Sequence, residues 1–305
     1  MDLITYRELE QKDEMMMLMD LAFWWPISPK DFDELINMDV RLRNSPVGFC
    51  AVKNERLAGY VGVMDIPTRT VRGETEVVGG IWCVATNPDF SRQGICKILM
   101  EKAHNYFRRQ KYRFSFLCTG RTIIAYGIYD KLGYTEVEYV NQFPSVYKVL
   151  DKTEPVEKKT GTVLAPEKIY MIYEKFVENK TGFAARQKDF LTLFAKRKRF
   201  DEGRSIQKDR GYALLTEARN VIKVQDLVAL DDAVYRQLID EVEQIARSGV
   251  INHAVTDDRL LSIYKSKGYR VQRGHHGVLM AKNLTDASID KVYSNSFYMG
   301  ALDWF

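Results

Sequence analysis

The chain has 305 residues, 46% of them hydrophobic and 28% charged, and this balance favours packed globular domains over disorder. At about 150 residues per domain, the length predicts two domains, each with its own core. The formal net charge of +4 is too small and too dispersed to favour nucleic acid or a membrane surface as the main partner.

The four cysteines stand at positions 50, 83, 96 and 118, without a CxxC pair or the spacing of a zinc site. We therefore expect free thiols in a reducing compartment, and no bound metal. Residues 1–14 lack the apolar core of a signal peptide, and no run approaches the ~20 apolar residues of a membrane span. These features predict a soluble, cytoplasmic protein.

The first half of the chain predicts a mixed-sheet α/β unit. A short strand at 4–6 precedes a Met-rich helix that ends near Phe23, because Pro26 cannot continue it. The elements expected after it are three antiparallel strands, a helix, a strand, a helix and a strand, at 48–53, 57–64, 76–86, 95–106, 114–118, 122–132 and 134–140. Strands that alternate with helices after a meander are typical of this class.

A charged, turn-prone segment at 151–161 marks the boundary between the domains. We expect a first domain at 1–150, a linker at 151–162 and a second domain at 163–305. In the second domain the sequence predicts helices at 167–179, 187–196, 234–245 and 258–267. It predicts strands at 211–216 and 221–228, before the third helix, and at 251–255, before the fourth.

A short internal sequence repeat links the two halves. The sequence IYDKLGY at 128–134 returns as IYKSKGY at 263–269, an offset of 135 residues, or about one domain. Because similar elements precede both copies, the repeat indicates a duplication.

A strand, a loop and a helix start follow one another between Val84 and Cys96. Such a junction exposes unpaired backbone N–H groups and the positive end of a helix dipole, which together favour a phosphate or pyrophosphate. Gly94 lets a ligand approach the backbone closely. Neither GxGxxG nor GxxxxGK[ST] is present, so the loop is not one of these nucleotide motifs.

This loop and a second motif resemble those of the GNAT N-acetyltransferases. The family's coenzyme loop has the form Gln/Arg-x-x-Gly-x-Gly/Ala, and here it is occupied by Ser91, Arg92, Gln93, Gly94, Ile95 and Cys96. The second motif, a tyrosine in a helix before a Gly-Phe/Tyr turn, matches AYGIYDKLGY at 125–134. Ser91 and Cys96 depart from the usual residues, and Arg92 can supply the positive charge instead.

The resemblance implies the fold, the co-substrate and the roles of particular residues. It implies acetyl-CoA with its pyrophosphate on the loop and its pantetheine along the strand residues Val84, Ala85 and Thr86. Tyr129 is the implied proton donor to the departing thiolate, and Trp24 and Trp25 are implied to line the acceptor site. The acceptor is then an amine on a small molecule, a peptide or a protein.

The two-domain plan resembles the Eis-type branch, in which a second, degenerate GNAT-like domain follows the first. Residues 228–232 contain no glycine and two carboxylates, which would repel pyrophosphate. We expect the sterol-carrier-like domain of longer members to be absent. Eis-type enzymes use the carboxylate of the final residue as the base, so the resemblance assigns that role to Phe305, with Asp303 as the alternative.

Two other classes of function are weaker readings of the same chain. The substituted loop positions allow a non-catalytic acyl-CoA-binding or scaffolding protein, whereas Tyr129 and its intact motif favour the enzyme. The basic run 196–199 is more typical of a solvated helix end than of an RNA-binding module. His275 and His276 are adjacent on a strand-like segment, so they point to opposite faces and do not favour a shared metal. The oligomeric state stays open.

Overall fold

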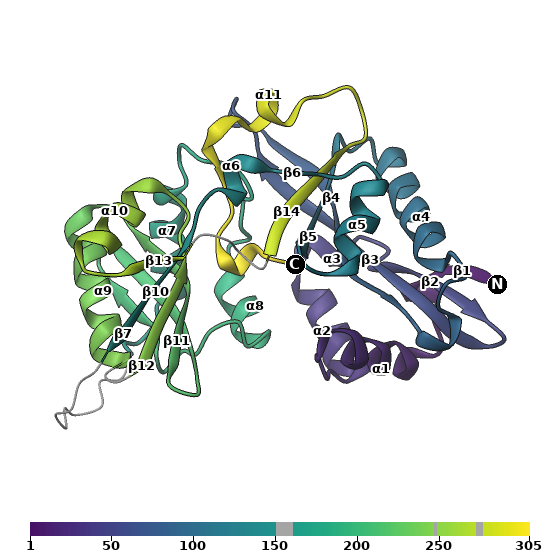
Figure 1. The fold of residues 1–305 in the computed structure, drawn as a ribbon, viewed down its shortest axis with the longest axis horizontal. Coiled ribbons are helices and arrows are strands. Elements are labelled where there is room, and N and C mark those ends of the chain that lie inside the picture. The colour runs from purple at the N-terminus through teal and green to yellow at the C-terminus, as the bar shows by residue number, and fades with distance from the viewer. Residues whose placement is uncertain (151–160, 247–248, 273–276) are drawn as a thin grey trace. The chain divides into compact units, whose positions relative to one another are not determined.

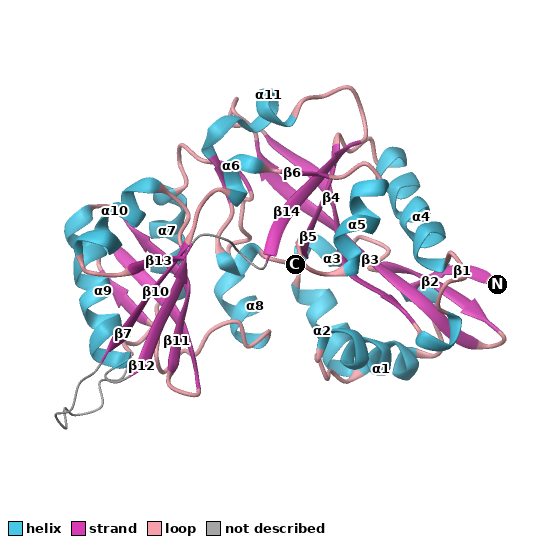
Figure 2. Cartoon of the chain, in the orientation of Figure 1, coloured by secondary structure: helices cyan, strands magenta, loops and turns pink. Residues whose placement is uncertain are grey.

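The computed structural model describes residues 1–150, 161–246, 249–272 and 277–305 (Figure 1). Most of the expected linker lies outside the described residues, as do His275 and His276. The chain divides into two compact units, and each combines helices with a mixed sheet (Figure 2). This confirms the predicted α/β class.

The first unit contains Met1–Val137, Gly277–Ser294 and Phe305. Its sheet has the strand order β1-β2-β3-β4-β5-β14-β6. The strands are β1 (Asp2–Thr5), β2 (Gly48–Lys53), β3 (Arg56–Arg69), β4 (Thr75–Thr86), β5 (Phe114–Gly120), β6 (Thr135–Glu136) and β14 (Gly277–Asn283). Neighbouring strands are antiparallel except β4 and β5, which run parallel.

The helices of the first unit are α1 (Lys12–Phe23), α2 (Pro29–Met38), α3 (Val40–Arg43), α4 (Ile95–Arg109), α5 (Ile124–Lys131) and α11 (Ile289–Tyr293), with 3-10 turns η1 (Tyr6–Glu8) and η2 (Pro88–Phe90). The helix predicted at 95–106 is confirmed as α4, and its residues Ile95, Leu99 and Ala103 are buried in one core cluster with Ile81 of β4 and Leu117 of β5. This packing fixes the start of α4 beside the end of β4.

The second unit contains Glu138–His276 and Asn295–Trp304. Its sheet has the order β13-β7-β12-β11-β10-β9, and β11 and β12 form its parallel pair. The strands are β7 (Ser145–Leu150), β9 (Ile206–Lys208), β10 (Gly211–Ala218), β11 (Val221–Ala229), β12 (Gly249–Ala254) and β13 (Arg270–Gln272), and β8 (Thr181–Gly182) pairs with β15 (Phe297–Tyr298). The helices are α6 (Glu138–Asn141), α7 (Pro166–Phe176), α8 (Phe190–Lys196), α9 (Asp232–Ala246) and α10 (Asp258–Ser266). The 3-10 turns are η3 (Ser294–Ser296), whose first residue belongs to the first unit, and η4 (Ala301–Asp303).

The compact units do not follow the predicted boundaries at 150 and 163. Strand β14 comes from late in the chain, yet it lies between β5 and β6 of the first unit. Strand β7 comes from the first half, yet it lies between β12 and β13 of the second. Each unit therefore receives one strand from the other half, an exchange that local periodicity does not reveal.

The two units are similar in their helix ends as well as in their strand order. After α5, Gly133 adopts φ +85° and Tyr134 N–H donates to Tyr129 O at 3.1 Å. After α10, Gly268 adopts φ +77° and Tyr269 N–H donates to Tyr264 O, also at 3.1 Å. Both are glycine C-caps in the left-handed region, so the repeated sequence has the same local structure in both units.

The strand predicted at 134–140 is wrong in its second half. Strand β6 covers only Thr135–Glu136, because β14 provides register partners for these two residues alone. The chain then enters the short helix α6 at Glu138.

The four cysteines are thiols that are not joined in disulfides, as predicted. Within the described residues, none of the helices is both long and apolar enough to cross a membrane.

Candidate acyl-transfer site

The parallel strands β4 and β5 separate in the middle of the first unit's sheet. Their register pairs run only from Gly79 with Ser115 to Ile81 with Leu117. Strand β4 then continues for five residues to Thr86, so its backbone leaves the β5 ladder at this point. The strand segment predicted to carry the donor, Val84 to Thr86, lies on this separated part.

A β-bulge distorts β4 just beyond the separation. Gly62 of β3 faces Trp82 and Tyr60 faces Ala85, so Cys83 and Val84 together oppose a single residue. Cys83 adopts φ +48°, which is uncommon for a residue other than glycine. The bulge turns peptide groups of β4 out of the ladder, and such groups can hydrogen-bond to a ligand. The sequence analysis placed the pantetheine along 84–86 but did not single out Cys83, since nothing in an apolar strand pattern signals a positive φ.

The predicted coenzyme loop leads from β4 into α4. Gly94 is the N-cap of α4 with φ +77°, and a Cβ atom placed there would meet nothing within 4 Å. The first helical N–H to find a backbone acceptor is that of Ile98, which donates to Gly94 O at 3.1 Å. The N–H groups before it are the ones a helix start leaves unsatisfied.

Basic side chains from the turn after β2 reach this loop. Lys53 Nζ donates to Gln93 Oε1 at 2.8 Å, and Arg56 pairs with Asp89 at 3.0 Å. Arg92 is exposed and adopts φ +61°. Lys53 and Arg56 were not predicted, because only the folded β2–β3 hairpin brings them to a loop some 40 residues away.

Cys96, the departure from the usual motif, is half-buried and packs against the core of the first unit. Burial raises the pKa of its thiol, so the group stays uncharged near neutral pH. An uncharged thiol at the start of α4 does not repel an anion there.

Tyr129 on α5 has the environment expected of a proton donor. Its side chain is 6% exposed, and no described residue forms a hydrogen bond with its hydroxyl. Burial raises the pKa of Tyr129, and the nearby thiols of Cys96 and Cys83 raise it further. The structure therefore brings together Tyr129, the bulge of β4 and the start of α4.

The equivalent tyrosine of the second unit is not free in this way. Tyr264 Oη lies 2.9 Å from His253 Nδ1, and both side chains are buried. Burial lowers the pKa of His253 to about 3, so this pair is neutral. The start of α9 is also closed, because Asp231 Oδ1 accepts from Val234 N–H at 3.0 Å and Asp231 Oδ2 accepts from Arg210.

The two predicted tryptophans have different surroundings. Trp24 is 91% exposed at the end of α1, and the structure does not bring it to the other predicted residues. The ring centroids of Trp25 and Trp82 are 6.2 Å apart, and Phe32 lies within 6 Å of both. Trp25 thus packs against Trp82 of β4, the residue directly before the bulge.

The tail of the chain is anchored in the second unit as far as Trp304. The carboxylate of Asp303 accepts hydrogen bonds from Nε and Nη2 of the buried Arg186, both at 2.9 Å. Arg199 Nη2 donates to Ala301 O at 2.8 Å. Both carboxylate oxygens of Asp303, the alternative to Phe305, are thus engaged by Arg186 within the second unit. Phe305 itself is grouped with the first unit.

The geometry agrees with what comparisons with known proteins find. Residues 5–137 match the family model described as an acetyltransferase (GNAT) domain. A GCN5-related N-acetyltransferase from Kribbella flavida superposes with a TM-score of 0.67 at 13% identity, covering 93% of this chain and 72% of that one. Eis1 from Mycobacterium abscessus gives 0.64 at 16% identity, with 93% and 74% covered.

A tandem GNAT protein from the clavulanic acid biosynthesis pathway superposes with a TM-score of 0.55 at 12% identity, covering 94% of this chain and 99% of that one. No protein with a curated description matches the chain significantly. Among the described residues, no three His, Cys, Asp or Glu side chains are grouped to hold a metal.

Proposed function

We propose that this chain transfers the acetyl group of acetyl-CoA to a primary amine, because residues 5–137 match the acetyltransferase (GNAT) domain model and the fold is similar to that of a tandem GNAT protein. The transfer takes place in the first unit. The observation that carries the proposal is the open start of α4 at Gly94 beside the separated end of β4. The hydroxyl of Tyr129, to which no described residue hydrogen-bonds, lies next to both.

The chain's own groups fit the coenzyme. The N–H groups from Arg92 to Cys96 would hold the pyrophosphate, because they precede the first intrahelical bond of α4 and nothing stands over Gly94. Val84, Ala85 and Thr86 would bind the pantetheine through backbone groups that β5 does not pair. Ser91 and Gln93 complete the loop, and Ile95 anchors it to the core.

Acetyl-CoA supplies an acetyl group that is already activated as a thioester. Tyr129 keeps its proton at neutral pH, because burial raises its pKa. Its Oη can therefore give that proton to a departing sulfur. The amine must lose a proton in the same reaction, and we assign its acceptance to the α-carboxylate of Phe305, as the Eis-type resemblance suggests.

The second unit is a degenerate copy in this proposal. Asp231 caps α9 where an open loop would be needed, and Tyr264 is bonded to His253. The acceptor is an amine on a small molecule, a peptide or a protein, with Trp25 beside it. The protein acts in the cytoplasm, with neither nucleic acid nor membrane as a partner.

The test is a screen of the full chain with acetyl-CoA against panels of amines, with free thiol release as the signal. The expected result is thiol release that depends on one class of amine. Tight binding of acetyl-CoA by calorimetry without thiol release from any panel would instead support a non-catalytic acyl-CoA-binding protein.

A further inference from the structure

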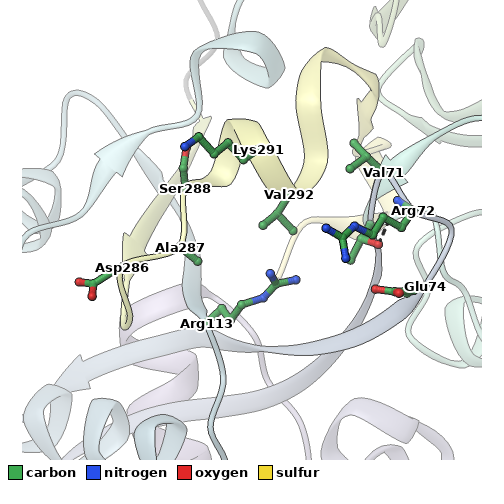
Figure 3. A pocket seen from close by; sticks show the side chains of 10 residues that line it. Val71, Arg72, Glu74, Arg113, Asp286, Ala287, Ser288, Lys291 and Val292 are labelled. Atoms are coloured by element: carbon green, nitrogen blue, oxygen red, sulfur yellow. Dashed lines mark hydrogen bonds between the residues drawn. The ribbon is translucent and has the colours of Figure 1, made fainter.

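A cavity of about 320 Å³ lies at the opposite end of β4 from the coenzyme loop. Its walls come from the β3–β4 turn at 70–74, from Arg113 before β5, and from the segment 286–292 around α11 (Figure 3). Strand β4 has 12 residues, which at ~3.3 Å per residue separates the two ends by roughly 40 Å. The cavity, which we call the arginine pocket, is therefore separate from the proposed acyl-transfer site.

Main-chain hydrogen bonds hold the walls of the arginine pocket together. Val71 N–H donates to Val292 O at 2.9 Å, which ties the β3–β4 turn to α11. Leu284 N–H donates to Arg113 O, also at 2.9 Å, and Thr70 N–H donates to Glu74 O across the β3–β4 turn. A pocket framed in this way is formed before a ligand arrives.

The side chain of Arg113 is also fixed in advance. Its Nε and Nη2 both donate to Glu76 Oε2 at 2.7 Å, and Tyr293 Oη donates to the other oxygen of the same carboxylate. These bonds leave Nη1 of Arg113 for a ligand. Figure 3 shows the guanidinium groups of Arg113 and Arg72 converging on the space below Val292.

The pocket carries charges of both signs that the protein does not neutralise. Within the part of the chain that the structure describes, neither Arg72 nor Glu74 has an ion-pair partner, although both line the cavity. Val71, Ala287 and Val292 add an aliphatic surface to the lining, and Thr70, Asp286, Ser288 and Lys291 add further polar and charged groups. Three cationic groups, two carboxylates and an aliphatic surface thus line a cavity of small-ligand size.

We propose that the arginine pocket binds a free aliphatic α-amino acid. The ligand's carboxylate lies between Arg72 and Arg113, where guanidinium groups form strong charge-assisted hydrogen bonds. Its ammonium group faces Glu74, and its side chain packs on Val71 and Val292. A ligand with both charges and an aliphatic group matches the two arginines, Glu74 and the aliphatic part of the lining.

The test is calorimetry on the full chain without acetyl-CoA, with L-leucine as the probe. Two matched probes each remove one charge: 4-methylpentanoate lacks the ammonium group, and 3-methylbutylamine lacks the carboxylate. We expect L-leucine to bind and each matched probe to bind at least about tenfold more weakly. No binding of L-leucine, equal binding of 4-methylpentanoate, or tighter binding of inorganic phosphate would each overturn the proposal.

Variants locate the binding on the protein. Arg72→Ala and Glu74→Gln should each weaken the binding of L-leucine at least about tenfold. Arg219 is an exposed arginine in the β10–β11 turn, and Arg219→Ala should leave this binding unchanged. Thermal unfolding checks that the two pocket variants stay folded. Gly94→Val should leave L-leucine binding unchanged, so a failure of the acyl-transfer proposal would not affect this result. Equal affinity in Arg72→Ala and the parent protein would refute the assignment.

Discussion

Replacing Tyr129 by phenylalanine should separate catalysis from stability in the first unit. The change removes a single hydroxyl that has no hydrogen-bond partner among the described residues, and the ring stays packed 6.1 Å from that of Tyr134. We therefore expect the free energy of unfolding to change by less than about 0.5 kcal/mol. Coenzyme affinity should hold as well, because the proposed pyrophosphate contacts come from backbone groups of the loop.

The rate should fall much more than the stability. A positioned general acid contributes about 10²–10⁴-fold, or roughly 3–5 kcal/mol of activation free energy, and Tyr129→Phe should lower kcat by a factor in this range. The assay is thiol release at saturating acetyl-CoA and amine, with the dissociation constant of acetyl-CoA from calorimetry. A fall in affinity with unchanged kcat would reduce Tyr129 to a packing residue.

Tyr264→Phe is the matched control, because it removes the same hydroxyl from the equivalent position of the second unit. There the hydroxyl is hydrogen-bonded to His253 at 2.9 Å in a buried site. Its loss should cost about 1–3 kcal/mol of unfolding free energy and leave kcat unchanged. If both variants slowed the reaction equally, the contrast between the two units would be refuted.

Three further outcomes test other parts of the argument. Gly94→Val should weaken acetyl-CoA binding in calorimetry by crowding the loop, whereas Gly268→Val, with the same φ of +77° and equally open surroundings, should not; equal affinities would refute the loop assignment. Burial lowers the pKa of His104 to about 4, so its contribution to stability is present above pH ~6.5 and is lost as the pH falls towards 4. Urea unfolding curves should show a loss of about 3 kcal/mol in unfolding free energy over this range, and His104→Gln should make the pH dependence weaker. A short peptide extension after Phe305 should suppress thiol release and preserve acetyl-CoA binding, whereas full activity would remove the α-carboxylate from the mechanism.

The parts of the fold that local chemistry determines could be predicted from the sequence. The start of helix α4 and the repeated helix–glycine–tyrosine sequence are local patterns, and the structure has a helix from Ile95 and a left-handed glycine after both α5 and α10. The proposed coenzyme loop was identifiable for the same reason, because a strand, a glycine and a helix start follow one another within a short segment.

The remaining features depend on contacts between distant residues. The bulge at Cys83 exists because β3 and β4 pair with different spacing on either side of it, and the sequence of β4 alone does not encode that mismatch. Trp24 and Trp25 are adjacent and chemically alike, yet only Trp25 finds Phe32 and Trp82. The arginine pocket was missed because its walls come from three segments that are far apart in the chain.

The strand exchange leads to the last prediction, that residues 1–150 will not fold alone. This fragment lacks β14, which pairs with β5 over seven residues and buries Val278, Leu279 and Met280 completely or almost so. At ~1.5–3 kcal/mol per buried side chain, their loss removes about 5–9 kcal/mol, which is comparable to the whole stability of a typical domain. We expect no cooperative thermal transition by circular dichroism.

A matched fragment should recover the fold. Strands β6 and β14 are antiparallel, and Val137 N–H donates to Leu279 O at 3.0 Å, so a short turn can join Val137 to Gly277. The chain 1–137 followed by such a turn and 277–294 restores β14 to its place between β5 and β6. It should unfold cooperatively and, if the loop at Gly94 is the coenzyme site, bind acetyl-CoA. Cooperative unfolding of 1–150 itself would show that β14 is dispensable and that the predicted boundary at 150 is a sufficient one.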